Sequence, residues 1–223
     1  MGNTEILSYL PSIAILVFAS IYGVVRLFKK SVPMYFQLAV CAVWSFAIQM
    51  IYSILIIVCA NDFQNDNNLS FLGMATMFTF LACSNYGQFN TLVDEGDKKL
   101  RPLRLVSLAA PAFAAAFYAF ICLRYEGATA WFDFVFATVM IPLAFSSYFN
   151  LKFVLMKDDG DNFIRGVKPL NLAALLASFS YMLYIFASFE EMFFLKTIAS
   201  GASVLLISSI VFLADWGRKQ WFK

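Results

Sequence analysis

The sequence predicts an all-α, polytopic membrane protein with seven transmembrane helices. Of its 223 residues, 61% are hydrophobic and only 13% are charged, whereas soluble domains carry a charge on about a quarter of their residues. Seven apolar stretches are each long enough to cross a bilayer as a helix, which takes about 20 residues. The basic residues gather in alternate loops, as expected of a chain that crosses the membrane repeatedly.

The seven expected spans fill nearly the whole chain, so we interpret residues 1–223 as a single transmembrane helical bundle. The spans are residues 6–28, 34–59, 69–93, 103–123, 129–155, 163–188 and 193–214. We interpret the first span as a retained helix and not as a cleaved signal peptide. Its only preceding charge is Glu5, and basic residues follow it from Arg26 onward.

The basic residues predict the orientation of the bundle. One side of the expected membrane carries 14 of the 16, namely Arg26, Lys29, Lys30, Lys98, Lys99, Arg101, Arg104, Lys152, Lys157, Arg165, Lys168, Arg218, Lys219 and Lys223. The other side carries Arg124 and Lys196. Because cytoplasmic loops are enriched in Lys and Arg, we expect the N-terminus outside and the C-terminus in the cytoplasm. The expected location is the plasma membrane.

A short polar pattern recurs in spans one, three and five. It consists of a serine and a tyrosine two positions apart, in the pairs Ser20/Tyr22, Ser84/Tyr86 and Ser146/Tyr148. The pairs are 64 and 62 residues apart, and each is followed by a basic loop and a proline, at Pro33, Pro102 and Pro169. Proline is favoured in the first turn of a helix. We therefore expect three tandem hairpins (1–64, 65–126 and 127–190) and then a seventh helix with a basic tail (191–223). The alternative is chance similarity among Ser- and Tyr-rich helices.

The polar side chains of these three helices form a candidate ligand-binding band near the cytoplasmic end. Lipid offers them no hydrogen-bond partner, so they should face one another, neighbouring helices or water. Two interpretations remain open: a polar cavity that binds a solute, or hydrogen bonds that hold the helices together. The candidate residues are Tyr22, Ser84, Asn85, Tyr86, Gln88, Asn90, Ser146, Tyr148 and Asn150.

Two further polar residues lie within expected spans. Gln49 lies deep in the second span, and Asp133, the only carboxylate expected inside a span, lies near the start of the fifth. Both are candidate ligand contacts, because polar groups are costly in a membrane. The alternatives are that Gln49 ties helices together and that Asp133 reaches the outer interface.

The residues needed for familiar catalytic and metal centres are missing from the sequence. The chain has no histidine, which excludes His-ligated haem, His-based metal centres and imidazole acid–base chemistry. Its four cysteines form no C-x-x-C pair, although Cys59 and Cys122 both end spans on the outer side and either pair or remain buried thiols. No phosphate-binding loop occurs. We expect no cofactor, no metal and no nucleic-acid partner, and no enzymatic centre is indicated.

The spans are poor in charge, which favours a neutral or amphiphilic ligand. We interpret the protein as a small permease-like bundle that binds or translocates such a molecule. The alternative is a ligand- or lipid-sensing, receptor-like or accessory subunit. Such a subunit would act through a membrane or cytosolic protein partner bound by the basic inner loops. Membrane lipids are expected partners in both cases.

Overall fold

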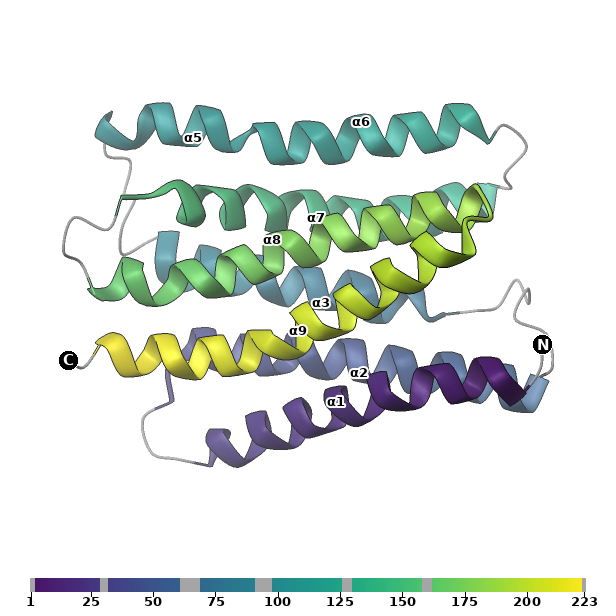
Figure 1. Ribbon diagram of the computed structural model, residues 1–223. Coiled ribbons are helices and arrows are strands. Elements are labelled where there is room, and N and C mark those ends of the chain that lie inside the picture. Colours follow the sequence, from purple (N-terminus) through teal and green to yellow (C-terminus); the bar gives the residue numbers. More distant parts are fainter. Residues whose placement is uncertain are drawn as a thin grey trace.

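The protein forms an elongated bundle whose helices run along a common axis (Figure 1). The computed structural model describes residues 3–28, 32–60, 69–90, 98–125, 130–157 and 162–221. Side chains are described for residues 11–28, 32–56, 69–87, 98–125, 134–157 and 162–220. The two chain ends lie at opposite ends of the bundle (Figure 1), as an odd number of crossings requires.

The predicted count of seven helical segments is confirmed. The elements are α1 (Asn3–Leu27), α2 (Met34–Ala60), α3 (Phe71–Ser84) with the π-helix η1 (Asn85–Asn90), the 3₁₀-helix η2 (Lys98–Leu100) with α5 (Arg101–Ser107) and α6 (Ala109–Arg124), α7 (Ala130–Leu155), α8 (Asn162–Phe189) and α9 (Phe193–Trp221). Within the described residues, five segments are long and apolar enough to cross a membrane. The protein is therefore a membrane-spanning helical bundle.

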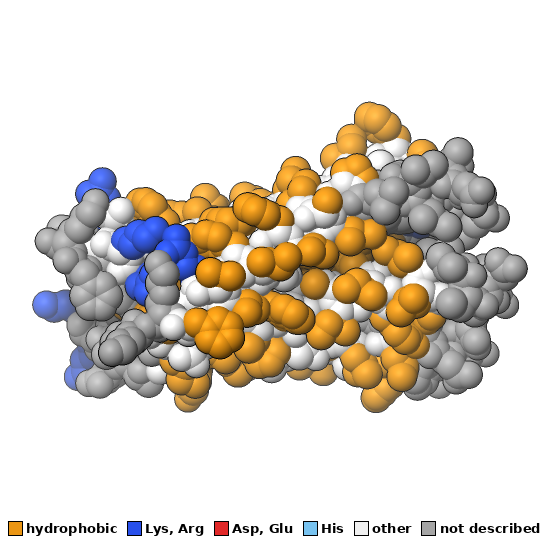
Figure 2. Space-filling view, turned by 90° about the horizontal axis from the view of Figure 1, so that it is seen from below, with side chains coloured by type: hydrophobic (Ala, Val, Ile, Leu, Met, Phe, Trp, Pro, Cys, Tyr) orange, Lys and Arg blue, Asp and Glu red, His pale blue; other side chains and the backbone are white. Residues whose placement is uncertain are grey.

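The surface of the bundle matches this assignment. Figure 2 shows hydrophobic side chains over the middle of the molecule and Lys and Arg side chains at the end where the C-terminus lies. Phe18, Ile141 and Phe145 are among the exposed apolar side chains of the bundle. An exposed belt of this kind is stable against lipid, whereas in water it would drive aggregation.

Three details of the helices differ from expectation. The third span changes from an α-helix to a π-helix at Asn85. Pro102 lies in the first turn of α5 as expected, but Pro169 lies inside α8 and does not open it. The seventh helix continues past residue 214 to Trp221. The expectation that Asp133 is the only carboxylate within a span is therefore wrong, because Asp215 lies inside α9 and is 1% exposed.

Five helices form a closed ring in the order α2, α3, α7, α8 and α9, with α9 packing back against α2. Helix α1 packs outside this ring against α2 and α9, and α6 packs against α7. Figure 1 shows α5 and α6 as a nearly continuous rod along one edge of the bundle. The core within the ring includes Phe78 and Tyr181, whose ring centroids are 6.0 Å apart across the α3–α8 interface.

Close approach of α2 and α3 depends on Gly73. A Cβ atom at this position would lie 2.5 Å from Cβ of Gln49 and 2.9 Å from the carbonyl oxygen of Ser45. Both distances are too short for a side chain, so only glycine allows α3 to lie this near to α2. A β-carbon at Gly201, in contrast, would meet no heavy atom within 4 Å.

We predict that Gly73→Ala destabilises the bundle, because the new methyl group must push α3 away from α2. The expected loss is about 1–3 kcal/mol of unfolding free energy, measured by denaturant titration of the purified protein. Gly201→Ala is the matched control and should be neutral or stabilising by roughly 0.5–1 kcal/mol. Equal stability of the two variants would contradict the close α2–α3 contact.

Candidate functional site

A cavity of about 220 Å³ lies between α2, α3, α8 and α9, in the half of the bundle nearer the N-terminus. Its lining residues are Phe46, Gln49, Met50, Ser53, Ile54, Ser70, Phe71, Met74, Tyr181, Tyr184, Ser200 and Ser203. Four helices of the ring therefore contribute to one partly open cavity. The volume exceeds the ~150 Å³ of a cavity that holds benzene.

The polar groups at this cavity are incompletely satisfied. The Oε1 atom of Gln49 is buried and accepts no hydrogen bond from any described residue. The position of Gln49 is fixed by Gly73, which brings α3 against it. Ser203, by comparison, donates to the carbonyl oxygen of Ala199 at 2.9 Å. A buried amide oxygen without a donor is costly, so a molecule that donates a hydrogen bond to Gln49 would be stabilised here.

None of the lining side chains carries a formal charge. A cation contacts one of the lining rings from the start of α9, where Nζ of Lys196 lies 5.7 Å from the ring centroid of Tyr184. Aromatic rings and methionines supply most of the walls, whereas Gln49, the serines and the tyrosine hydroxyls supply polar groups. The cavity therefore suits a neutral molecule with an apolar body and at least one hydrogen-bond donor.

Part of the predicted inner polar band forms hydrogen bonds within α7, between η1 and α7, and between α3 and α2. Nδ2 of Asn85 donates to Oδ1 of Asn150 at 2.8 Å, and Nδ2 of Asn150 donates to Oγ of Ser146 at 3.1 Å. Ser84 donates weakly, at 3.4 Å, to the carbonyl oxygen of Tyr35 on α2. Asn85, Ser146 and Asn150 are at most 3% exposed. This arrangement matches the interpretation that these residues hold helices together.

The serines and tyrosines of the recurring pattern have different environments. Ser20, Ser84 and Ser146 are all buried, whereas Tyr86 is 58% exposed. The cause is helix geometry, because residues two positions apart lie about 200° apart around a helix. Tyr148 is half-buried and its ring lies edge-on to Phe149 at 5.1 Å. Tyr86 thus lies on the outer side of its helix.

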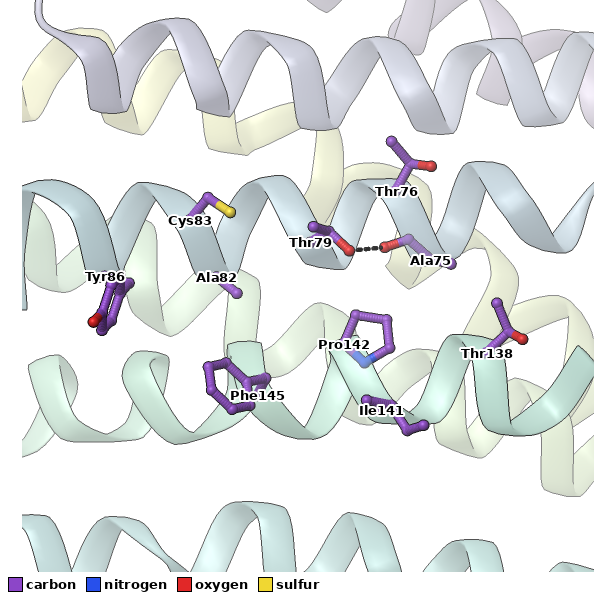
Figure 3. A pocket seen from close by; sticks show the side chains of 10 residues that line it. All are labelled: Ala75, Thr76, Thr79, Ala82, Cys83, Tyr86, Thr138, Ile141, Pro142 and Phe145. Carbon is purple, nitrogen blue, oxygen red and sulfur yellow. Dashed lines mark hydrogen bonds between the residues drawn. The ribbon is translucent and has the colours of Figure 1, made fainter. Parts of the chain in front are cut away.

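Tyr86 contributes to a groove of about 550 Å³ between α3 and α7 (Figure 3). The hydroxyls of Thr76, Thr79 and Thr138 line this groove, but each donates to a carbonyl oxygen of its own helix. The groove therefore offers a ligand little hydrogen bonding. Exposed Ile141 and Phe145 form its opposite wall (Figure 3), so it suits lipid chains better than a polar solute.

Tyr22, the tyrosine of the first serine–tyrosine pair, lies on α1 and contacts α9. Its hydroxyl donates to Oδ2 of Asp215 on α9 at 2.8 Å. Arg218 and Lys219 contact the same carboxylate at 2.7 and 2.9 Å, and Nε of Arg26 lies 3.7 Å away. Sequence reasoning missed Asp215 because the apolar run ends just before it. The four-residue spacing between Asp215 and Lys219, which places both on one helix face, was the sequence signal that the helix continues.

Several predicted residues fall outside the described side chains. Gln88 and Asn90 lie in the π-helix η1 and Asp133 lies in the first turn of α7, but their side chains are not among those described. The same is true of Cys59. Their roles stay predictions.

Comparisons with protein-family models, with curated protein sequences and with solved structures gave no match. The site must therefore be interpreted from its own geometry.

We predict that the Asn85–Asn150 hydrogen bond couples α3 to α7 energetically. In a double-mutant cycle with Asn85→Leu and Asn150→Leu, the coupling free energy should be about 0.6 kcal/mol and at most about 1.7 kcal/mol. Unfolding free energies of the four proteins give this value. A cycle between Asn150→Leu and Ser20→Ala is the control, because Ser20 donates to the carbonyl oxygen of Leu16 in its own helix. A coupling no larger than in that control would contradict the proposed role.

Proposed function

We propose that the protein binds a neutral or amphiphilic small molecule in the cavity between α2, α3, α8 and α9, as a small permease-like bundle. The observation that carries this proposal is Gln49, which lines the cavity and whose buried Oε1 atom has no donor among the described residues. The uncharged lining supports a neutral ligand. The aromatic walls support one with an apolar body.

A receptor-like role is the second candidate, and the packing of the other half of the bundle favours it. Tyr35, Phe36 and Phe153 are at most 1% exposed, and Tyr35 and Phe36 pack beside Ala214 and Arg218 near the C-terminal end. A sensor needs only one entrance, whereas a permease must also open this end at some stage. The permease-like and receptor-like roles share the proposed ligand site and differ in whether the C-terminal end of the bundle opens.

We predict that indole, a flat molecule with a single N–H donor, binds to the cavity. Indene, which has nearly the same shape without the N–H, should bind about tenfold more weakly, since it leaves Gln49 without a donor. Isothermal titration calorimetry on the protein in nanodiscs measures both affinities, after subtraction of partitioning into empty nanodiscs. In Gln49→Leu the two probes should bind with equal affinity.

Ser45→Ala is the matched control for this experiment. Ser45 lies one turn from Gln49 on α2, is not part of the lining and bonds to the carbonyl oxygen of Cys41. Gln49→Leu should also leave stability unchanged or raise it by about 1 kcal/mol, because it removes an unpaired buried acceptor. If indole and indene bind alike to the unaltered protein, the cavity does not recognise donors.

We predict for the permease role that the C-terminal half of the bundle opens when ligand is bound. Ser84, which is 2% exposed, should become accessible from the C-terminal face. A Ser84→Cys variant, in a background with the four native cysteines replaced by alanine, is treated in proteoliposomes with a membrane-impermeant maleimide. Labelling should rise when indole is added.

Arg101→Cys is the positive control, because Arg101 is exposed at the start of α5 and should be labelled with or without ligand. If Ser84→Cys stays unlabelled while indole binds, the permease role is contradicted and the receptor-like role remains.

A further inference from the structure

Three cations surround a single buried carboxylate at the C-terminal end of the bundle. Asp215 is 1% exposed and contacts Arg26 of α1 as well as Arg218 and Lys219 of α9. We call these four residues the Asp215 cluster. One carboxylate neutralises one cation, so among its described members the cluster has two positive charges in excess.

The cations of the Asp215 cluster retain donors that Asp215 does not use. The Nε atom of Arg218 is buried and donates to none of the described residues. One terminal nitrogen of its guanidinium group contacts the carboxylate at 2.7 Å. Lys219 is 55% exposed and Arg26 is 25% exposed. Fixed, partly exposed guanidinium and ammonium groups are the groups that bind phosphate oxygens in proteins.

The cluster lies where a lipid headgroup would reach it. Arg26 is in the last turn of α1, and the exposed apolar residues Val25, Phe28 and Trp216 flank the cluster in sequence. Tryptophan is enriched at the level of lipid headgroups. Basic pockets between transmembrane helices at the cytoplasmic side commonly bind anionic headgroups.

We propose that the Asp215 cluster binds the phosphate group of an anionic membrane phospholipid between the C-terminal ends of α1 and α9. Asp215 holds the three cations in place, and their excess charge binds the phosphate. Free inorganic phosphate shares this chemistry, but the adjacent exposed apolar residues favour a ligand with acyl chains. This site is separate from the cavity proposed for the small molecule.

Native mass spectrometry of the full chain tests the lipid site. The protein is purified in detergent and equilibrated with phosphatidylglycerol or with phosphatidylcholine, which has no net charge. The unaltered protein should retain phosphatidylglycerol in preference to phosphatidylcholine. In the double variant Arg26→Gln/Lys219→Gln, retention of phosphatidylglycerol should fall about 25-fold, or about fivefold for each cation. Arg218 stays to neutralise Asp215, so the variant should fold.

Lys98→Gln/Arg101→Gln is the matched control, because it removes two exposed cations at the same end of the bundle but outside the cluster. It should retain phosphatidylglycerol like the unaltered protein, and thermal unfolding checks that both double variants are folded. If the two double variants lose lipid equally, the loss reflects the overall positive charge of this end of the bundle and not the Asp215 cluster, and the proposal is wrong. If the Arg26→Gln/Lys219→Gln variant unfolds, single Lys219→Gln, which alters the most exposed cation, must still lower retention about fivefold.

Inorganic phosphate at millimolar concentration distinguishes the two sources of the ligand. If phosphatidylglycerol stays bound in the presence of inorganic phosphate, the result supports the lipid site. Displacement of the lipid by phosphate would overturn the proposal in favour of a free anion.

Discussion

The structure depends on one constraint: inside a bilayer, a hydrogen-bonding group must find its partner within the protein. Lipid chains are as apolar as leucine, so hydrophobic burial alone gives little preference for one helix neighbour over another. Polar contacts supply that preference here. Asn85 pairs with Asn150 and thereby joins α3 to α7, while Tyr22 pairs with Asp215 and joins α1 to α9. A third bond, from Tyr35 to the carbonyl oxygen of Ala214, joins α2 to α9.

The same constraint explains why a buried polar group without a partner, such as the amide oxygen of Gln49, marks a candidate binding site. Most described serines and threonines within the helices donate to a carbonyl oxygen in the preceding turn, as Ser178 and Thr79 do. The amide oxygen of Gln49 cannot be satisfied in this way. It is an acceptor, so it needs a hydrogen-bond donor from outside its own helix. A polar cavity of this size holds water when no ligand is present. A ligand that replaces the water must supply an equivalent donor to bind well, which is why the proposed ligand is one with a hydrogen-bond donor.

The sequence predicted the seven helices well, because membrane thickness and apolar length constrain them directly. It did not predict which faces meet. The pairs Ser84/Tyr86 and Ser146/Tyr148 look like units in the sequence, yet helix rotation turns each serine inward and leaves Tyr86 outward. Gln49 was identified as a candidate, but only the arrangement of α2, α3, α8 and α9 shows that it lines a cavity. The contacts between distant helices, such as Tyr22 with Asp215, have no signal in one sequence.

Two glycine contacts divide the helices around the cavity into two close pairs. Gly73 brings α3 against Gln49 of α2, and Gly217 of α9 lies against the backbone of Gly166 of α8. Each pair leaves no room for a side chain at its contact, so within each pair the helices are held in a fixed relation. The cavity lies between the pairs, since α2 and α3 form one side and α8 and α9 the other.

A ligand in the cavity therefore contacts the interface between two closely packed units. Packed interfaces tend to have discrete alternative arrangements and do not deform continuously. Asp215 lies on α9 beyond the cavity, so a shift of the α8–α9 pair would also move the carboxylate that binds Tyr22 and Arg26 of α1. Helix α9 thus connects the cavity to the basic end of the bundle. The helix geometry also changes on the α3 side of the bundle, because α3 passes into the π-helix η1 at Asn85. π-helical turns often occur at functional sites.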